Sequence, residues 1–386
     1  MRVLHFYSTY YPDTFGGAEL AINQICESTF RHGVRSTVLV LSPHPTPREL
    51  PIDRHLVTRC KSDFEIASNR FSIGAMFEFA KLAKSHDIVH FHFPWPFADF
   101  CQLMVGGSTP YVVTYHSDIV KQKLLLKLYS PLMHNFLRRA SAIIATSSQY
   151  LASSKILARH LENTFVAPLA LELKNVQIPS SARIFELKSR LPARFFLFIG
   201  VLRYYKGLHL LIESVRGTDI EVVIAGTGPE EEALKRRAQG LRNVHFMGKV
   251  SEDDKVALLS IAYGFVFPSH LRSEAFGMAL LEACAFRLPL ITFEIGTGTS
   301  HVNSHEVTGF VLDRPDDANP AKAFAALREA MKKLLEAPAL ARSYGDAARI
   351  RVETCFNPKQ LGEKYALIYQ MAMGDVAARS RLAGFE

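Results

Sequence analysis

The stretch FFLFIGVLRYYKGLHLLIES, residues 195–214, has the clearest local pattern in the sequence. An uninterrupted apolar run comes first, a turn with glycine and basic residues follows, and a helix-like segment completes the unit. Short apolar runs that alternate with helical stretches are typical of a parallel sheet covered on both faces. The stretch therefore predicts a strand–helix unit that opens a new domain.

The same rhythm runs through both halves of the chain. Its strand-like runs are RVLHFYS, RSTVLVLS, DIVHFHF, YVVTYH, SAIIATS and NTFVAP, and later FFLFIGVL, IEVVIAG, VHFMG, YGFVFPS and LPLITF. Between the two sets, residues 170–193 lack a clean apolar period. The pattern predicts an α/β protein with two doubly wound, Rossmann-like domains, residues 1–175 and 190–359, that face each other across a cleft. We expect a helix at about 360–386 to pack back on the first domain.

Composition and charge exclude several classes of protein. The chain has 386 residues, 48% hydrophobic and 21% charged, which is globular composition. No apolar run is long enough to span a membrane, and the five scattered cysteines form no CxxC pair, so we expect a cytoplasmic protein. Residues 1–190 hold 21 Lys and Arg against 14 Asp and Glu, and thus most of the net charge of +8. No nucleic-acid-binding signature accompanies this charge.

Two glutamates stand eight positions apart in SEAFGMALLEACAF, residues 273–286. Residues 276–278 are expected in the first turn of a helix, where free N–H groups and the helix dipole attract an anion. On one continuous helix, Glu274 and Glu282 would be roughly 12 Å apart along the axis. Glycosidase carboxylates are about 5 to 9.5 Å apart, so the spacing favours a ligand held at both ends over an acid/base pair. A solvated acidic helix is the alternative, which the apolar neighbours disfavour.

Other candidate residues stand where strands are expected to end. Arg203 and Lys206 follow FFLFI, where they would neutralise a diphosphate, with a solvated loop as the alternative. His116 and Asp118 follow YVVTY and are expected to project into the cleft, although a lone histidine there is often structural.

Two further features concern backbone approach and metals. Gly16 and Gly17 form a turn after the first strand that allows close approach of a ligand, or that is only a tight turn. His90 and His92 lie on one strand without a carboxylate cluster, so we expect no metal site.

The chain resembles glycosyltransferase family 4, whose members are retaining enzymes of the GT-B fold. The resemblance rests on SEAFGMALLEACAFRLPLI, on YYPDTFGGAE and on FIGVLRYYKGLHLLIES, and it covers essentially the whole chain. It implies a GT-B architecture, a nucleotide-sugar donor bound by the second domain, an acceptor bound by the first, and no metal cofactor.

The resemblance also implies roles for particular residues. Catalytic roles would belong to Glu274, which contacts hydroxyls of the donor sugar, and to His116, which contacts the sugar near the reacting carbon. The other donor contacts that it implies are the amides of Phe276, Gly277 and Met278 for the sugar and diphosphate, Glu282 for the ribose, Arg203 and Lys206 for the leaving diphosphate, the Gly16–Gly17 loop, and backbone near Gly248 and Val250 for the nucleobase. Asp118 is a candidate for acceptor hydroxyls.

Finer details indicate a substrate class. YYPDTFGGAE, LRYYKGLH and EIGTGTSHVN look most like bacterial enzymes that build mannose- or rhamnose-containing O-antigen of lipopolysaccharide. The resemblance therefore favours GDP-mannose or GDP-rhamnose over UDP-sugars as donor, and a lipid-linked saccharide as acceptor. Lys121, Lys123 and Lys127 in an expected amphipathic helix would suit the anionic surface of the inner membrane; an ordinary surface helix is equally consistent.

Three positions depart from the family pattern. Val201 stands where many members carry Arg, Arg287 replaces a common Gly, and APLALEL replaces the usual PNG turn. Two other classes of function stay open at this point, a GT-B-fold sugar-nucleotide epimerase and a non-catalytic nucleotide-sugar sensor.

Overall fold

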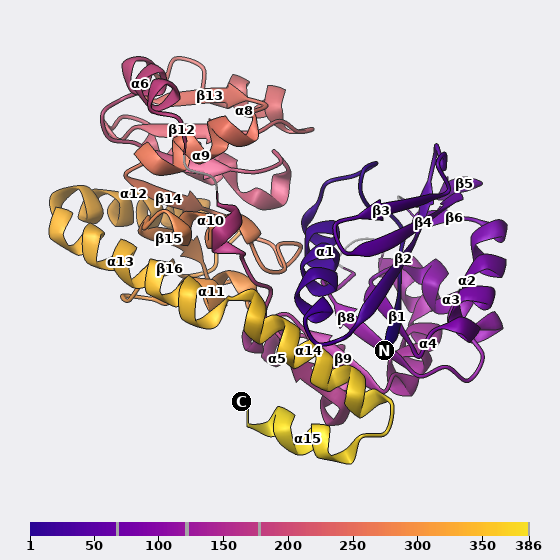
Figure 1. Cartoon of the computed structure of the whole chain (residues 1–386). Coiled ribbons are helices and arrows are strands. Elements are labelled where there is room, and N and C mark those ends of the chain that lie inside the picture. Colours follow the sequence, from indigo (N-terminus) through magenta and orange to yellow (C-terminus); the bar gives the residue numbers. More distant parts are fainter. Residues whose placement is uncertain (67–68, 120–122, 177–178, 385–386) are drawn as a thin grey trace. The chain divides into compact units, whose positions relative to one another are not determined.

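The computed structural model describes residues 1–66, 69–119, 123–176 and 179–384 (Figure 1). The chain forms two compact units. Unit 1 contains Met1–Leu169 and Pro358–Glu386, and unit 2 contains Ala170–Asn357. Each unit is an α/β sheet with helices on its faces, so the predicted fold class is confirmed for both.

Unit 1 is built on an eight-stranded sheet in the order β10-β9-β8-β7-β1-β2-β4-β3, in which only β3 runs antiparallel to its neighbour. Its strands are β1 (Arg2–Tyr7), β2 (Arg35–Ser42), β3 (Glu49–Ile52), β4 (His55–Lys61), β7 (Ile88–Phe93), β8 (Tyr111–Tyr115), β9 (Ala142–Ala145) and β10 (Thr164–Val166), with a separate hairpin of β5 (Phe64–Ile66) and β6 (Asn69–Phe71). Its helices are α1 (Gly17–Phe30), α2 (Ile73–Ser85), α3 (Pro96–Val105), α4 (Lys123–Arg139), α5 (Ser148–Ser153), α14 (Pro358–Ala372) and α15 (Val376–Ala383), with short 3-10 turns at Leu157–Arg159 and Leu161–Asn163.

Unit 2 is built on a parallel six-stranded sheet in the order β13-β12-β11-β14-β15-β16. Its strands are β11 (Phe196–Ile199), β12 (Val222–Ala225), β13 (Val244–Gly248), β14 (Gly264–Phe267), β15 (Leu290–Phe293) and β16 (Gly309–Leu312). Its helices are α6 (Ser181–Arg190), α7 (Leu208–Val215), α8 (Glu231–Arg237), α9 (Glu252–Ile261), α10 (Met278–Ala285), α11 (Gly298–Val302), α12 (Pro320–Glu336) and α13 (Pro338–Cys355), with 3-10 turns η3 (Leu173–Asn175) and η4 (Tyr204–Lys206).

Two parts of the fold differ from the prediction. The stretch predicted as a break between domains contains α6, of which only Leu187 is fully buried, so the sequence shows no apolar period there. Strands β3 to β6 were not predicted. The buried Arg59 interrupts the apolar run of β4, and the hairpin strands are only three residues long, too short for a clear alternation.

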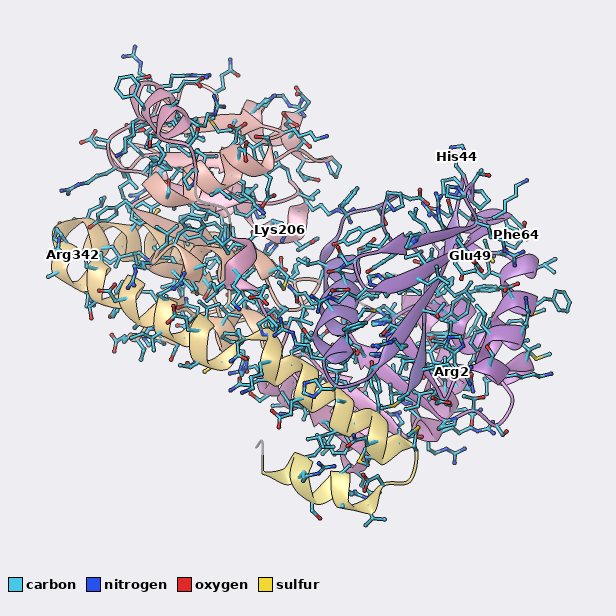
Figure 2. All side chains as sticks on the ribbon, viewed as in Figure 1. Arg2, His44, Glu49, Phe64, Lys206 and Arg342 are labelled. Carbon is cyan, nitrogen blue, oxygen red and sulfur yellow. The ribbon has the colours of Figure 1, made fainter. Side chains whose placement is uncertain are left out.

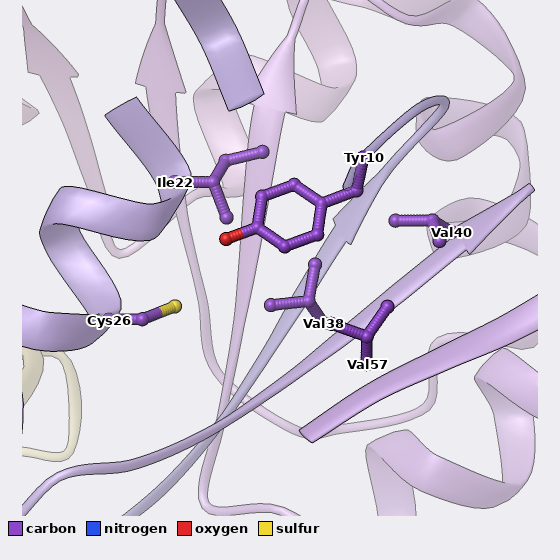
Figure 3. Packing of buried hydrophobic residues seen from close by; sticks show 6 residues of the cluster. All are labelled: Tyr10, Ile22, Cys26, Val38, Val40 and Val57. Atoms are coloured by element: carbon purple, nitrogen blue, oxygen red, sulfur yellow. The ribbon is translucent and has the colours of Figure 1, made fainter. Parts of the chain in front are cut away.

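A buried cluster fixes the loop that follows β1 (Figure 3). It packs the loop against α1, β2 and β4, and consists of Tyr10, Ile22, Cys26, Val38, Val40 and Val57. The Tyr10 hydroxyl also forms a 3.1 Å hydrogen bond with Nε2 of His55. Because Tyr10 is held by both apolar packing and a hydrogen bond, the turn at Gly16 and Gly17 starts from a fixed position.

Helices α14 and α15 belong to unit 1, so the single helix expected at about 360–386 is divided into two. Helix α14 lies along α1, and a Cβ added at Gly362 would be 2.3 Å from the Ser28 carbonyl oxygen. Its Tyr365 and Tyr369 are fully buried. Among the described helices, none combines the length and the apolar character needed to cross a membrane.

We predict that Gly362→Ala destabilises unit 1, because the added methyl group would overlap the Ser28 carbonyl and force α14 away from α1. The expected loss is about 1–3 kcal/mol of unfolding free energy. Urea denaturation, combined with hydrogen exchange at amides of α1, measures it. The control is Gly74→Ala in α2, where the nearest atom is 3.8 Å away and alanine is expected to stabilise the helix. Equal stability of the two variants would contradict the packing argument.

Candidate functional site

In unit 2, a buried ion pair joins the ends of two neighbouring strands. Lys206 lies in η4 after β11, and Glu274 lies in the loop after β14, the strand beside β11. The Lys206 ammonium contacts Oε2 of Glu274, and the two side chains are only 11% and 10% exposed. Ser269 donates a 3.1 Å hydrogen bond to the same oxygen. The structure therefore brings two predicted site residues together at the carboxyl edge of the sheet, where open α/β sheets bind ligands.

A glycine allows the turn with Lys206 and the loop with Glu274 to lie close together. Gly207, directly after Lys206, has φ +70°, and a Cβ there would lie 1.9 Å from the Pro268 carbonyl oxygen. Any larger residue would push the Lys206 turn away from the loop that carries Glu274. Figure 2 labels Lys206 in this turn of unit 2.

The helix after Glu274 begins later than the sequence predicts. Helix α10 starts at Met278, and Gly277 precedes it in the left-handed conformation with φ +86°. Glu274 and Phe276 are thus outside the helix, and the 12 Å estimate for two glutamates on one continuous helix does not apply. The Phe276 side chain is buried, with its ring 6.0 Å from that of Phe356, so only its backbone is available to a ligand.

The start of α10 can still bind an anion. The Leu280 N–H donates to the Gly277 carbonyl at 2.8 Å. The N–H groups of the first two helical residues have no partner within the helix, and Gly277 has no side chain to cap them. The helix dipole adds a partial positive charge at this end, and the loop before α10 carries Glu274 with its partner Lys206. A diphosphate would meet backbone donors and a cation together.

Glu282, on α10, forms the second part of the unit 2 site. Its Oε1 accepts a 2.6 Å hydrogen bond from Lys255 of α9, which also contacts Glu252 at 2.8 Å. Burial lowers the pKa of Lys255, but the two glutamates outweigh this effect and raise it overall. Within the described residues, Oε2 of Glu282 has no hydrogen-bond partner, so it is available to a hydroxyl group. The contact between Lys255 and Glu282 was not predicted from the sequence, because a lysine near the start of a helix indicates no particular partner.

The predicted nucleobase stretch leads into the same helix α9. Gly248 ends β13 with φ +63°, and its carbonyl accepts the Gly226 N–H at 2.8 Å. Val250 is half-buried, and the next residue, Ser251, caps α9 through a capping box with Asp254. The turn at Gly248 and Val250 is therefore rigidly connected to the helix that positions Lys255.

Arg203 does not share the environment of Lys206. It is exposed, and its carbonyl accepts the Lys206 N–H at 3.0 Å. Its guanidinium group has no carboxylate partner in the described part of the chain. The structure therefore supports a fixed position for Lys206 and none for Arg203.

In unit 1, the turn at Gly16 and Gly17 is held by a glutamate that the sequence did not single out. Glu19 is 7% exposed and accepts hydrogen bonds from Thr9 at 2.8 Å and from Thr14 at 2.7 Å. A Cβ at Gly16 would lie 2.5 Å from its carboxylate, whereas Gly17 has open space around it. The contact with Glu19 therefore explains why residue 16 is a glycine. The open space at Gly17 lets a ligand come close to its backbone.

His116 ends a chain of hydrogen-bonded histidines. Its Nε2 lies 3.0 Å from Nδ1 of His92, and Nε2 of His92 lies 3.1 Å from Nδ1 of His5. Since a neutral imidazole has one N–H and one acceptor nitrogen, the chain must run in a single direction. One direction leaves Nδ1 of His116 as an acceptor, and the other places a proton on it. The tautomer of His116 is therefore coupled to two residues on neighbouring strands.

His90 packs against this row of hydrogen-bonded histidines. Its ring is 4.4 Å from that of His92, and its nitrogens bond to Tyr369 of α14 at 2.8 Å and to Thr114 at 2.7 Å. Nitrogens of His5, His90 and His92 lie within 4.8 Å of one another, a spacing that could accept a metal. Both nitrogens of His90 and of His92 are already hydrogen-bonded, however. The expected absence of a metal stays a prediction.

Asp118, predicted as a contact for acceptor hydroxyls, is bound within unit 1. Its Oδ1 accepts hydrogen bonds from Tyr115 and Ser154, each at 2.8 Å, and its N–H donates to the Tyr150 hydroxyl. This arrangement fixes the loop that begins at His116. An acceptor contact by Asp118 stays a prediction.

The predicted basic helix corresponds to α4, which begins at Lys123. Lys121 lies outside the described residues. Lys127, Arg138 and Arg139 are exposed, so α4 presents basic side chains to solvent.

We predict that Lys206→Met destabilises unit 2 by about 3 kcal/mol, because it leaves the Glu274 carboxylate buried without its cation. Adding Glu274→Gln to this variant should recover most of the loss. Urea denaturation, combined with hydrogen exchange at amides of β11 and β14, measures the coupling free energy between Lys206 and Glu274. Lys332→Met, which breaks an exposed pair with Glu336, serves as control and should change stability by no more than about 0.5 kcal/mol. Additive effects of the two site substitutions would show that the pair is not coupled.

We predict that stability falls as the pH drops from about 6.5 toward 4. Burial lowers the pKa of His116 to about 4 and that of His5 to about 3, whereas histidines in an unfolded chain titrate near 6.5. Between these values the unfolded chain binds protons that the folded chain does not, so stability is full above 6.5 and is lost below it. NMR titration of the ring resonances measures this. A folded-state titration of His116 near 6.5 would contradict the geometry.

Comparison with known proteins agrees with this geometry. Residues 181–351 match the family described as Glycosyl transferases group 1, and residues 15–155 match Glycosyltransferase Family 4. The chain is 46% identical to D-rhamnosyltransferase WbpZ of Pseudomonas aeruginosa over 92% of both chains. It is 43% identical to O-antigen chain mannosyltransferase C of Escherichia coli over 96% of this chain and 98% of that protein.

A solved structure shows the shared fold. Sucrose-phosphate synthase from Thermosynechococcus elongatus superposes with a TM-score of 0.76 at 20% identity, over 96% of this chain and 98% of the other. The predicted GT-B fold, with two Rossmann-like domains, is thereby confirmed. With the family matches and the two relatives above 40% identity, the chain belongs to glycosyltransferase family 4.

Proposed function

We propose that this glycosyltransferase moves mannose or rhamnose from a GDP-sugar to a lipid-linked saccharide during synthesis of the O-antigen of lipopolysaccharide. The names of the two similar relatives, an O-antigen mannosyltransferase and a D-rhamnosyltransferase, support the sugar and the pathway. The proposal rests mainly on the buried ion pair of Lys206 and Glu274, which lies before the start of α10, where Gly277 provides no side-chain cap. A UDP-sugar donor is the alternative within the same family.

In the proposed complex, unit 2 binds the donor. Glu274 accepts hydrogen bonds from hydroxyls of the sugar, and Glu282 binds the ribose through Oε2, the oxygen that does not contact Lys255. The amides of Phe276, Gly277 and Met278 donate to the sugar and the diphosphate. Backbone near the Gly248–Val250 turn lines the nucleobase.

Lys206 has a second role in the reaction. As the bond between the anomeric carbon and the phosphate oxygen breaks, negative charge grows on the leaving GDP, and a nearby ammonium stabilises it more in the transition state than in the ground state. Lys206 is already fixed by Glu274, so little reorganisation is needed. Arg203, which is exposed, would contact the diphosphate only when the donor is bound.

The acceptor is supplied by unit 1. The acceptor oxygen attacks the anomeric carbon from the face that GDP leaves, its proton passes to a phosphate oxygen of GDP, and the anomeric configuration is retained. His116 lies beside the reacting carbon in this scheme, with the loop at Gly16 and Gly17 facing the diphosphate and Asp118 near acceptor hydroxyls. We expect no metal, because the Lys206 ammonium and hydrogen bonds from the α10 amides would offset part of the charge of the diphosphate. We place the enzyme in the cytoplasm, with its basic α4 at the anionic inner-membrane surface.

The test is incubation with GDP-mannose, GDP-rhamnose and UDP-glucose, each with and without a lipid-linked saccharide. Transfer that needs the acceptor, and that is faster with a GDP-sugar, supports the proposal. An epimerised nucleotide sugar formed without acceptor would instead establish the epimerase alternative. Binding without any conversion would favour a sensor.

We predict that Glu282→Gln weakens GDP binding by about tenfold, because a hydrogen bond between a hydroxyl and a charged carboxylate is lost. Glu252→Gln is the matched control, since Glu252 contacts the same Lys255 from the exposed side. Isothermal titration with GDP measures both variants. If Glu252→Gln weakens binding as much as Glu282→Gln does, the effect comes from Lys255 and the ribose contact is wrong.

A further inference from the structure

Unit 1 contains an apolar pocket that the proposed chemistry does not use. It has a volume of about 430 Å³ and lies between the hairpin β5–β6 and helices α2 and α3. Its lining consists of Phe64, Phe71, Ser72, Ile73, Met76, Pro96, Phe97 and Phe100. Volumes of this size are typical of small-molecule sites.

Aromatic rings form the wall of the pocket. The Phe64 and Phe71 rings stack at 5.1 Å, and Phe71 meets Phe97 edge-on at 5.5 Å. These contacts attach the short hairpin to α3, and Figure 2 labels Phe64 on that hairpin. The pocket is therefore a defined feature of the fold.

The rim of this pocket is unusually exposed for apolar side chains. Phe64, Ile73 and Phe100 are 50%, 65% and 44% exposed, and Phe77 and Met104, about one helical turn after Ile73 in α2 and Phe100 in α3, are exposed as well. Exposed apolar side chains that gather at one pocket mark a binding site more often than scattered ones do. Among the described residues of the lining, Ser72 alone has a polar side chain, and its hydroxyl already accepts the Ala75 N–H at 3.1 Å.

A cationic hollow adjoins the apolar pocket. It has a volume of about 310 Å³, shares Ser72 with the pocket, and includes Arg48, Arg59 and Lys61 against one carboxylate, Asp63. Arg48 is paired with Glu78, and Arg59 with Asp13. Lys61 is exposed and has no ion-pair partner within the described residues. Asp63 accepts the Ile73 N–H at 2.8 Å and is not paired with Lys61. The hollow beside the apolar pocket thus contains an ammonium that no described carboxylate pairs with.

Both hollows lie at the carboxyl edge of the unit 1 sheet. The cationic hollow is at the end of β4, and the apolar pocket includes Pro96, just after β7. His116 follows β8, which pairs with β7 in parallel. The pocket, the cation and the proposed acceptor-side histidine are therefore on the same edge of one sheet.

We propose that this pair of hollows binds a phosphate-bearing lipid, with the hydrocarbon chain in the apolar pocket and the phosphate at Lys61. This proposal rests on the proposed function, in which the acceptor is lipid-linked, and it assigns the lipid part of that acceptor to named residues. A peptide would need partners for its backbone N–H and C=O groups, which this lining does not offer, whereas a hydrocarbon chain needs none. The adjoining ammonium matches a phosphate and not a neutral lipid.

The test is co-sedimentation of the full chain with phosphatidylcholine vesicles that contain a long-chain polyprenyl phosphate, the corresponding polyprenol, or neither. We expect binding to be strongest with the phosphate. Ile73→Ser and Phe100→Ser should each weaken it by about tenfold, because an apolar side chain no longer covers the lipid chain. Lys61→Glu should reduce binding to the phosphate vesicles by about fivefold or more, and leave binding to the polyprenol vesicles unchanged.

The controls separate this proposal from others. Leu161→Ser changes an exposed apolar residue of unit 1 outside the pocket and should bind vesicles like the parent. Thermal stabilisation by GDP reports on folding and donor binding in every variant. Equal binding to all three kinds of vesicle would overturn the proposal, as would self-association of the chain that the pocket variants abolish without affecting vesicle binding.

Failure of the proposed function gives a different result. If no sugar is transferred to any acceptor, vesicle binding by the parent and its loss in the pocket variants can still be measured. If transfer occurs, the pocket variants should lose it with a lipid-linked acceptor and keep it with a soluble acceptor that lacks the hydrocarbon chain. Equal loss with both acceptors would contradict a lipid site.

Discussion

The Lys206–Glu274 ion pair is the constraint on which the unit 2 site depends. It connects the turn after β11 to the loop after β14, and it exists because Gly207 permits the two backbones to approach. Two charges that are about nine-tenths buried are costly to desolvate and are stable only together. A protein that keeps such a pair before an uncapped helix start has a cation and backbone donors fixed before any ligand arrives, which is the preorganisation that transfer from a diphosphate requires.

Unit 1 holds neutral groups in fixed positions, whereas unit 2 holds an ion pair. The row of histidines from His5 through His92 to His116 is too deeply buried to be charged near neutral pH, so it fixes the orientation of His116 and couples its tautomer to those of His92 and His5 instead of supplying a positive charge. Helix α14 takes part through Tyr369, which bonds to His90. Helix α14, close to the end of the chain, therefore helps to hold the histidines on which the position of His116 depends.

The sequence predicted the parts that arise from local patterns. The alternation of apolar runs and helices identified both sheets, and the motif around Glu274 and Glu282 identified the family. The boundary of α10 was placed too early, because only the backbone angle of Gly277 shows where the helix begins. Glu19 and Lys255 were missed because their partners are distant in sequence or unremarkable in type, and the histidine chain was missed because it joins three strands. The partition of the chain at 169/170 likewise follows from tertiary packing.

In the proposed complex, the donor diphosphate binds between Lys206 and the start of α10. A crystal structure of the full chain with GDP-mannose tests it most directly, through the positions of the phosphate oxygens. We predict that one lies within about 3 Å of the Lys206 ammonium and another at the same distance from the amide of Gly277 or Met278. A diphosphate bound elsewhere, with Lys206 still contacting only Glu274, would contradict the claim.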